Sequence, residues 1–244
     1  MRLTPGIFVT GTGTGVGNTV ASAALLRLAA RHGRRVVGLK PVASGSGRAG
    51  PDGALRNSDA LELQAAASVT LPYELVNPFC FEPAIAPHIA SREAGRAMGL
   101  ASLEDWYRRA SAGADLALLE GAGGWRVPLH PGGFLSDLPE RLELGVILVV
   151  GLTLGCLNHA RLTAEALEGG GRCRLLGWIA NHVDPGFERV EDNLAMLAEL
   201  LGAPPLVRLP YVAGPTAPST SPRIELADEP RLLAALGIGA HAVK

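Results

Sequence analysis

Gly11-Thr12-Gly13-Thr14-Gly15-Val16-Gly17-Asn18-Thr19 follows the apolar run Ile7-Phe8-Val9 and precedes an Ala/Leu-rich segment, residues 19–31, with helical periodicity. A strand, a glycine-rich loop and a helix in this order are typical of a phosphate-binding site. Glycines allow backbone N–H groups to point at an anion, and the following helix adds the positive end of its dipole. The sequence therefore predicts an anion site at the start of this helix.

Two known loop patterns compete for this stretch. In the triphosphate-binding pattern G-x-x-x-x-G-K-[ST], Gly17 and Thr19 fit, but Thr12 replaces the first glycine and Asn18 replaces the lysine. The pattern T-G-x-x-x-G-x-G of short-chain dehydrogenases fits residues 10–17 completely. The loop by itself therefore favours a dinucleotide.

The residues that would have to accompany the loop favour a triphosphate instead. A dinucleotide site needs an acidic residue after the second strand to bind the ribose, but the expected strand 35–40 ends in Lys40. No tyrosine is followed by a lysine four positions later. The expected strand 115–120 ends in Glu120, where a carboxylate can hold Mg²⁺ beside the Thr19 hydroxyl.

Composition points to small-molecule ligands. The 244 residues are 48% hydrophobic and have a net charge of −1, which gives no reason to expect nucleic acid or a membrane as a partner. The longest apolar run, residues 146–152, is far shorter than the roughly 20 residues that cross a bilayer. No signal-like stretch precedes the first strand, so a cytoplasmic location is expected. Only Lys40 and Lys244 are lysines, so Lys40 must provide any lysine chemistry in the body of the chain.

Strands and helices alternate along the chain, which predicts a single α/β domain over residues 1–244 with a doubly wound, mostly parallel sheet and helices on both faces. Residues 41–57 are expected to form a loop, Ser58-Asp59 to cap a helix, and residues 214–222 to form a loop before a short closing helix. The further expected strands are 146–150, 175–180 and 206–209, and the further expected helices are 58–67, 87–94, 103–112, 157–167 and 188–201. The strand ends would gather Thr14, Thr19, Lys40, Glu120 and Asn181 at one edge.

Two stretches, Lys40-Pro41-Val42-Ala43-Ser44-Gly45-Ser46 and Glu120-Gly121-Ala122-Gly123-Gly124-Trp125, resemble the dethiobiotin synthetase family of P-loop enzymes. The resemblance extends over nearly the whole chain, and the other matching stretches are residues 8–12, 56–61, 146–151 and 177–181. It implies an ATP-dependent ligase that closes the ureido ring in biotin biosynthesis. One amine of 7,8-diaminopelargonate takes up CO₂ or bicarbonate as a carbamate, ATP phosphorylates that carbamate, and the second amine closes the ring. The resemblance also implies a homodimer.

The family's functional residues can be placed on this chain. The resemblance implies that Lys40 is catalytic and that Thr19, Asp59 and Glu120 hold Mg²⁺. The implied substrate-binding residues are Thr14, Ser44, Gly155, Cys156, Leu157 and Asn158. The implied ATP-binding residues are Gly15, Val16, Gly17, Asn18, Thr19, Val20, Asp59, Glu120, Gly121, Ala122, Gly123, Asn181, His182, Leu209, Pro210 and Tyr211.

The phosphate loop departs from the family. The family loop reads Gly-Thr-Asp-Thr-Glu-Val-Gly-Lys-Thr, whereas this chain has Gly13, Gly15 and Asn18 at the acidic and lysine positions. Loss of one such positive charge typically reduces a rate by about 10²–10³. The sequence therefore leaves three hypotheses: an active or weakened synthetase, a non-catalytic descendant that binds nucleotide or diamine, and a short-chain-type NAD(P) oxidoreductase.

Overall fold

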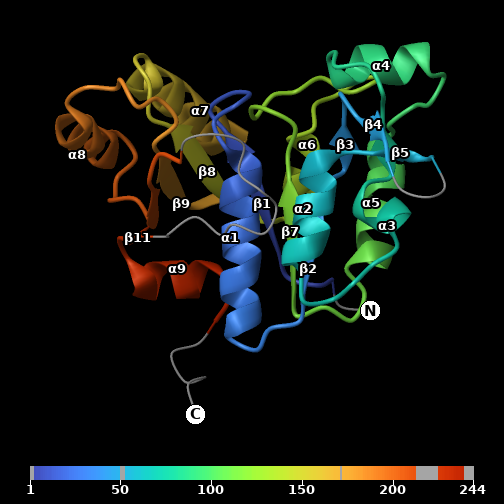
Figure 1. Ribbon diagram of the computed structural model, residues 1–244, viewed down its shortest axis with the longest axis horizontal. Helices are drawn as coiled ribbons and strands as arrows, with labels where there is room; N and C mark the ends of the chain where they lie inside the picture. Colours follow the sequence, from blue (N-terminus) through green and yellow to red (C-terminus); the bar gives the residue numbers. More distant parts are fainter. Residues whose placement is uncertain (1–2, 50–52, 171, 213–224, 239–244) are drawn as a thin grey trace.

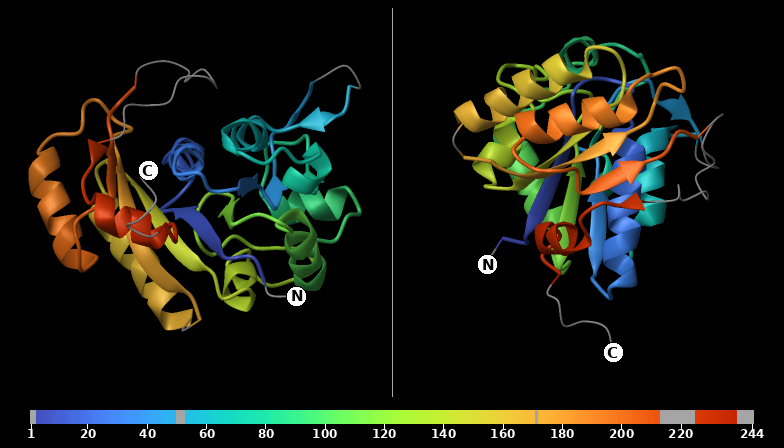
Figure 2. Two further views of the ribbon diagram at one scale, coloured as in Figure 1. Left: turned by 90° about the horizontal axis from the view of Figure 1, so that it is seen from below. Right: turned by 90° about the vertical axis from the view of Figure 1, so that its left-hand side faces the viewer.

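The computed structural model describes residues 3–49, 53–170, 172–212 and 225–238, and these form a curled α/β sandwich (Figures 1 and 2). Within them, a seven-stranded sheet has the order β11-β10-β9-β8-β1-β7-β2. All neighbouring pairs are parallel except β10 with β11. The strands are β1 (Gly6–Gly11), β2 (Val36–Leu39), β7 (Leu116–Glu120), β8 (Gly145–Gly151), β9 (Arg174–Asn181), β10 (Val207–Leu209) and β11 (Glu225–Leu226). The predicted doubly wound, mostly parallel sheet is confirmed.

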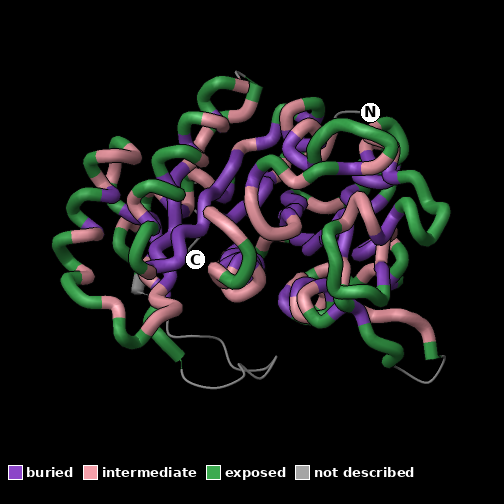
Figure 3. The backbone as a smooth tube through the Cα atoms, turned by 90° about the horizontal axis from the view of Figure 1, so that it is seen from above, coloured by how far each residue is buried: buried purple, intermediate pink, exposed green. Residues whose placement is uncertain are grey.

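Helices cover both faces of this sheet because its strands are apolar on both sides. Ile7 and Val9 of β1 pack on one face against α1, α2 and α9, whereas Phe8 packs on the other against α5 and α6. Helices α7 and α8 cover the β8–β9 part of that second face. The helices are α1 (Asn18–Arg31), α2 (Ser58–Ala66), α3 (Tyr73–Val76), α4 (Pro87–Glu93), α5 (Leu100–Ala110), α6 (Asp137–Arg141), α7 (Cys156–Gly170), α8 (Val190–Leu200) and α9 (Glu229–Ala235). Figure 3 shows the buried strands inside and the exposed turns of the helices and loops around them.

Parallel pairing brings the carboxyl ends of the central strands to one edge. In the sheet register, Val9 lies opposite Glu120, Gly11 opposite Val149, and Gly151 opposite Asn181. Open parallel sheets bind ligands outside this edge, because loops and helix N-termini meet there. The glycine-rich loop, residues 12–17, lies at this edge between β1 and α1.

Several local predictions were wrong. The segment 41–57 is not a plain loop: β3 (Val42–Ala43) pairs with β6 (Phe79–Cys80), and β4 (Gly47–Arg48) pairs with β5 (Leu55–Arg56). These two-residue strands have no periodicity that a sequence pattern could reveal. The short helices α3 and α6 and the antiparallel edge strand β11 were missed for the same reason. The loop predicted over 214–222 lies outside the described residues.

Candidate active site at the carboxyl edge of the sheet

The glycine-rich loop leaves the N-terminus of α1 open to an anion. Gly17 precedes α1 in the left-handed conformation, and no side chain caps the first N–H groups of the helix. Gly15 also has a positive φ of 79°, which only glycine adopts without strain. The uncapped N–H groups and the positive end of the helix dipole therefore favour a phosphate at this point.

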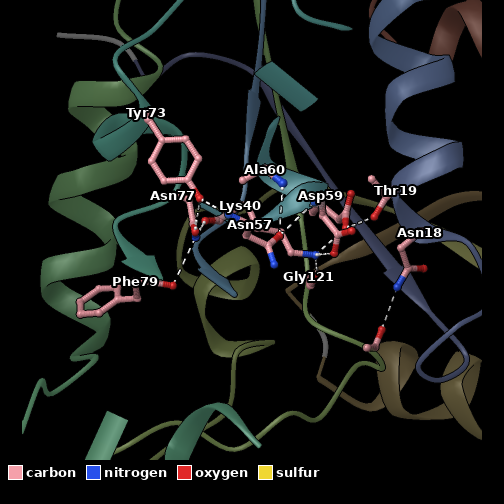
Figure 4. Close-up of polar contacts among 12 residues, drawn as sticks. Asn18, Thr19, Lys40, Asn57, Asp59, Ala60, Tyr73, Asn77, Phe79 and Gly121 are labelled. Carbon is pink, nitrogen blue, oxygen red and sulfur yellow. Dashed lines mark hydrogen bonds and ion pairs between the residues drawn. The ribbon is translucent and has the colours of Figure 1, made fainter. Parts of the chain in front are cut away.

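Asn18 links the start of α1 to a second glycine-rich stretch, residues 121–124, and carries no charge. Its Nδ2 donates to the Gly123 carbonyl at 3.1 Å, and its buried Oδ1 has no hydrogen-bond partner among the described residues (Figure 4). The amide also lies close to Gly11, where an added Cβ would be 2.5 Å from Oδ1. A neutral amide thus occupies the position where the triphosphate-binding pattern has a lysine.

A buried ion-pair cluster lies beside the loop. Lys40 Nζ is 2.5 Å from Glu120 Oε1 and 3.2 Å from Asp59 Oδ2, and it also donates to the Gly121 carbonyl at 3.0 Å. Thr19 Oγ1 donates to the same Glu120 oxygen at 2.8 Å. Lys40 is 5% exposed and Glu120 is 1% exposed. Figure 4 shows the Lys40, Asp59 and Thr19 side chains meeting at this point.

The Lys40 side chain is a cation throughout the neutral pH range. Burial by itself lowers the pKa of Lys40, but the charges of Glu120 and Asp59 raise it, and the net shift is above the ordinary value of 10.5. The ammonium offsets one of the two negative charges of Glu120 and Asp59, so the cluster keeps a net negative charge. It also remains a positive charge that can face a ligand in the adjoining cavity.

Asp59 is free to face the cluster because another residue caps α2. The Asn57 side chain accepts hydrogen bonds from the N–H groups of Asp59 and Ala60, at 3.1 and 3.3 Å. The predicted cap by Ser58-Asp59 is therefore wrong by one residue. Asparagine at this position satisfies two helix N–H groups, and the Asp59 carboxylate, whose side chain is 41% exposed, points toward Lys40.

The oxygens around Lys40 suit a hard divalent cation. In the part of the chain that the structure describes, no three His, Cys, Asp or Glu side chains are grouped so that they could hold a metal ion by themselves. Two carboxylates and the Thr19 hydroxyl do converge, however, and Glu120 Oε2 is buried without a hydrogen-bond partner. Mg²⁺ typically takes one or two protein carboxylates and completes its octahedron with phosphate oxygens and water. These residues therefore fit the predicted magnesium site, as an incomplete set of ligands.

A cavity of about 410 Å³ opens from this cluster. It brings together six of the residues singled out from the sequence: Thr14, Lys40, Ser44, Asp59, Ala122 and Gly123. Ser44 Oγ is buried without a partner among the described residues, so it is available to a ligand. Sequence reasoning missed the apolar wall formed by residues 84–87; the only available signal was the proline-bounded stretch from Pro83 to Pro87.

The expected ATP-binding residues at the ends of β9 and β10 lie elsewhere on the same edge. Asn181, at the end of β9, uses its Nδ2 to bind the Val16 carbonyl at 2.8 Å, so part of its side chain fixes the glycine-rich loop. His182 contacts Tyr211 edge-to-face, with ring centroids 6.3 Å apart. His182, Leu209 and Pro210 line a second cavity of about 210 Å³.

The segment Gly155–Asn158 does not line the cavity around Lys40. Gly155 lies in the turn before α7, and residues 156–158 form the first turn of that helix, with Cys156 buried and Asn158 exposed. Val20 belongs to the first turn of α1, where it packs against the core. In the described chain, the expected substrate residues Gly155, Cys156, Leu157 and Asn158 are therefore separate from Thr14 and Ser44.

Comparison with known proteins decides the family. A family model described as an AAA domain matches residues 5–219. The ATP-dependent dethiobiotin synthetase BioD of Pseudomonas paraeruginosa is 54% identical over 216 residues, 87% of this chain and 93% of that protein. The chain belongs to the dethiobiotin synthetase family. The synthetases of Chromohalobacter salexigens and Yersinia pestis are 51% and 50% identical, over 86% and 84% of this chain and 91% and 85% of their own lengths.

Solved structures agree on the fold of this dethiobiotin synthetase family member. The septum site-determining protein MinD of Pyrococcus horikoshii, complexed with Mg-ADP, is similar with a TM-score of 0.52 and 16% identity. That match covers 85% of this chain and 82% of MinD. A ParA family ATPase from Chlorobium tepidum gives a TM-score of 0.52 and 15% identity, with 86% and 85% of the chains covered. In the described residues, no helix is long and apolar enough to cross a membrane.

Gly17→Ala is expected to weaken MgATP binding at least about tenfold. Gly17 has φ 89°, a conformation that costs an L-residue about 1–2 kcal/mol, and an added Cβ would lie 2.0 Å from Asn181 Nδ2. Gly13→Ala is the matched control, because nothing lies within 4 Å of its added Cβ. Calorimetric titration with MgATP and thermal melting would test both variants. Equal binding by the two variants would contradict this account of the loop.

Proposed function

We propose that this protein makes dethiobiotin from 7,8-diaminopelargonate, CO₂ and MgATP. The observation that supports this most strongly is the Lys40 ammonium, held by Glu120, Asp59 and the Gly121 carbonyl at the wall of a 410 Å³ cavity. A carbamate and a transferring phosphoryl group are both anionic, and a buried cation beside the phosphate loop stabilises both. Cytoplasmic location is part of the proposal, because ATP and the diamine are cytoplasmic metabolites.

The proposed reaction has three steps. One amine of the substrate adds to CO₂ and loses a proton, which gives a carbamate. A carbamate oxygen then attacks the γ-phosphorus of ATP, so that ADP leaves and a carbamic–phosphoric anhydride forms. The second amine attacks the carbamoyl carbon, a proton is lost, phosphate leaves and the ureido ring closes.

The residues at the cavity have separate parts in this proposal. Thr14 and Ser44 bind the diamine, and the uncapped N–H groups of α1 bind ATP phosphates. Lys40 neutralises the carbamate and the phosphoryl group as charge moves between them. Mg²⁺, held by Thr19, Asp59 and Glu120, would supply positive charge to the β- and γ-phosphate oxygens.

Phosphate release from MgATP tests the proposal. We expect stoichiometric phosphate and a product with the mass of dethiobiotin when the diamine and bicarbonate are both present, and neither product when the diamine is omitted. Binding of MgATP and diamine without phosphate release would instead identify a non-catalytic binding protein. Neither the site nor the comparisons favour the oxidoreductase hypothesis; a bound reduced nicotinamide, detected by its absorbance, would revive it.

We also infer a homodimer, formed in part by the start of α7. Leu154 precedes this helix and is 94% exposed, and Leu162, within the helix, is also exposed. The adjoining residues 155–158 do not reach the cavity of their own chain, so a partner subunit would bring them to a substrate pocket. An isolated leucine on the surface needs no explanation, but one beside residues expected to bind substrate does.

Leu154→Glu is expected to weaken the dimer by about 10²-fold or more. Burial of a leucine contributes about 1.5–3 kcal/mol, and a symmetric dimer loses two of them and gains two unfavourable charges. Light scattering during gel filtration would show a monomer at micromolar concentration. Leu61→Glu, on the exposed side of α2, is the control and should leave the mass unchanged. A dimer that persists in Leu154→Glu would exclude this surface.

A further inference from the structure

The main chain and the side chain of Lys40 belong to one closed ring of hydrogen bonds. The Lys40 carbonyl accepts from Asn77 Nδ2 at 2.7 Å. Asn77 Oδ1 accepts from the Tyr73 hydroxyl at 3.1 Å, and that hydroxyl accepts from the Asn57 N–H at 2.7 Å. Asn57 caps the helix that bears Asp59, and Asp59 accepts from Lys40 Nζ. Figure 4 shows these residues as a continuous chain of contacts.

We propose that Tyr73 and Asn77 are positioning residues for the ligase reaction. Their hydrogen bonds tie the end of β2 to the start of α2 and thereby set the distance between the Lys40 ammonium and the Asp59 carboxylate. Neither Tyr73 nor Asn77 lines the cavity, so they act through the residues they hold there, which are Lys40, Asp59 and Asn57. The inference rests on the proposed function and adds two residues to its machinery.

Tyr73 is suited to hold two segments in register. It is 8% exposed, and its hydroxyl both accepts and donates, so it bridges two polar groups that would otherwise be buried without partners. Burial raises the pKa of Tyr73 above its ordinary value, so the phenol stays protonated and keeps its donor. The Arg56 guanidinium lies over the ring, 4.4 Å from its centroid, and limits its movement.

Asn77 binds the main chain of Lys40 within the ring. It is buried, and its Nδ2 donates both to the Lys40 carbonyl and to the Phe79 carbonyl, the latter at 3.2 Å. The Lys40 N–H donates to the Val76 carbonyl at 2.8 Å. Both main-chain polar groups of Lys40 are thus bound by the α3 segment rather than by a neighbouring strand of the main sheet. Displacement of α3 would therefore move the catalytic lysine.

Packing holds α3 in place from its other side. Trp106 of α5 donates from Nε1 to the Leu75 carbonyl at 2.8 Å, and Val76 is buried. The α3 side of the ring of hydrogen bonds is consequently attached to the core of the domain, whereas the Asp59 side chain, on the opposite side of the ring, is partly exposed. The position of Asp59 depends on the ring more than on its own packing.

Tyr73→Phe is expected to lower kcat by about 10- to 100-fold, because a displacement near 1 Å at the reacting groups costs up to about 10²-fold. The Mg²⁺ concentration for half-maximal rate should rise, while KM for the diamine changes less. Tyr107→Phe is the matched control: Tyr107 is 0% exposed, and its hydroxyl donates only to the Thr4 carbonyl in the described residues, far from the cavity. Both variants remove one buried hydroxyl, but only the first opens the ring.

A second readout does not depend on turnover. In Lys244→Arg protein, Lys40 is the only lysine of the chain, so [¹³Cε]lysine labelling gives a single nuclear magnetic resonance signal from the side chain in question. We expect Tyr73→Phe to shift and broaden this signal and Tyr107→Phe to leave it unchanged. Asn77→Asp, which keeps the acceptor for Tyr73 but loses the donor to Lys40, should act like Tyr73→Phe and serves if that variant does not fold.

The outcomes separate the two proposals. If the unsubstituted protein does not turn over but the Lys40 signal responds to Tyr73→Phe alone, the proposed function fails and the positioning role stands. The positioning role is overturned if Tyr73→Phe and Tyr107→Phe lower the melting temperature by the same amount and do not differ in the Lys40 signal or in kcat. Tyr73 would then be structural only.

Discussion

Asn18→Lys is expected to increase the rate of phosphate release by about 10²–10³, the factor that one electrostatic stabiliser of a developing charge typically contributes. The substituted ammonium would lie at the N-terminus of α1, where the triphosphate-binding pattern places a lysine against the β- and γ-phosphates. A neutral asparagine amide on a shorter stem cannot provide that charge.

The loop can accept the longer side chain. Asn18 Nδ2 now donates to the Gly123 carbonyl, and a lysine ammonium can donate to the same oxygen while ATP is absent. Substitution also removes the buried, unpartnered Asn18 Oδ1, so the folded state should not lose stability on that account. Rates with MgATP, diamine and bicarbonate should be measured for both proteins side by side.

Asn18→Gln is the matched control for this experiment. It lengthens the side chain but adds no charge, so its rate should remain within a few-fold of the unsubstituted protein. An equal gain in the glutamine variant would point to loop geometry as the cause. No gain with lysine would show that Lys40 and Mg²⁺ already supply the charge that the reaction needs.

Lys40→Met is expected to lower the rate by about 10³ or to abolish it. The variant removes a buried cation from the proposed site of phosphoryl transfer, a loss of the same kind as that of an oxyanion donor. It also leaves Glu120, which is 1% exposed, without its cation; loss of one partner of a buried pair costs about 3–5 kcal/mol of stability.

Mg²⁺ provides the distinguishing measurement for Lys40→Met. The Lys40 ammonium forms ion pairs with both Asp59 and Glu120, so it competes with any metal ion for their oxygens. Its removal should leave Mg²⁺ binding at least as tight as before, in a calorimetric titration, although turnover is lost. Weaker Mg²⁺ binding in Lys40→Met would contradict the proposed metal site.

Lys40→Arg keeps the charge but not the geometry, because a planar guanidinium does not fit the contacts of a compact ammonium. This control should retain thermal stability better than Lys40→Met and still lose most of the activity. The raised pKa of Lys40 adds a second check: below about pH 10, activity should not decline through loss of this proton.

The glycine-rich loop shows what a sequence pattern can predict. Its glycines, the apolar strand before it and the periodic helix after it are neighbours along the chain, so their local geometry follows from local residue types. The continuous apolar run 146–150 likewise indicated a strand buried on both faces of a parallel sheet, and parallel pairing then placed Glu120 at the edge that holds the loop. These features of the fold were predictable from pattern alone.

The sequence by itself determined the layered α/β fold and the location of Lys40 and Glu120 at the same edge of the sheet. Periodicity and the rules for parallel connections are properties of the chain. Only the tertiary structure decided that Asn57 caps α2, that Asn181 fixes Val16, and that Asn77 holds Lys40. Those last two contacts join residues 165 and 37 positions apart. Such pairs depend on how whole elements pack, and no local preference of asparagine specifies which distant backbone group it will bind.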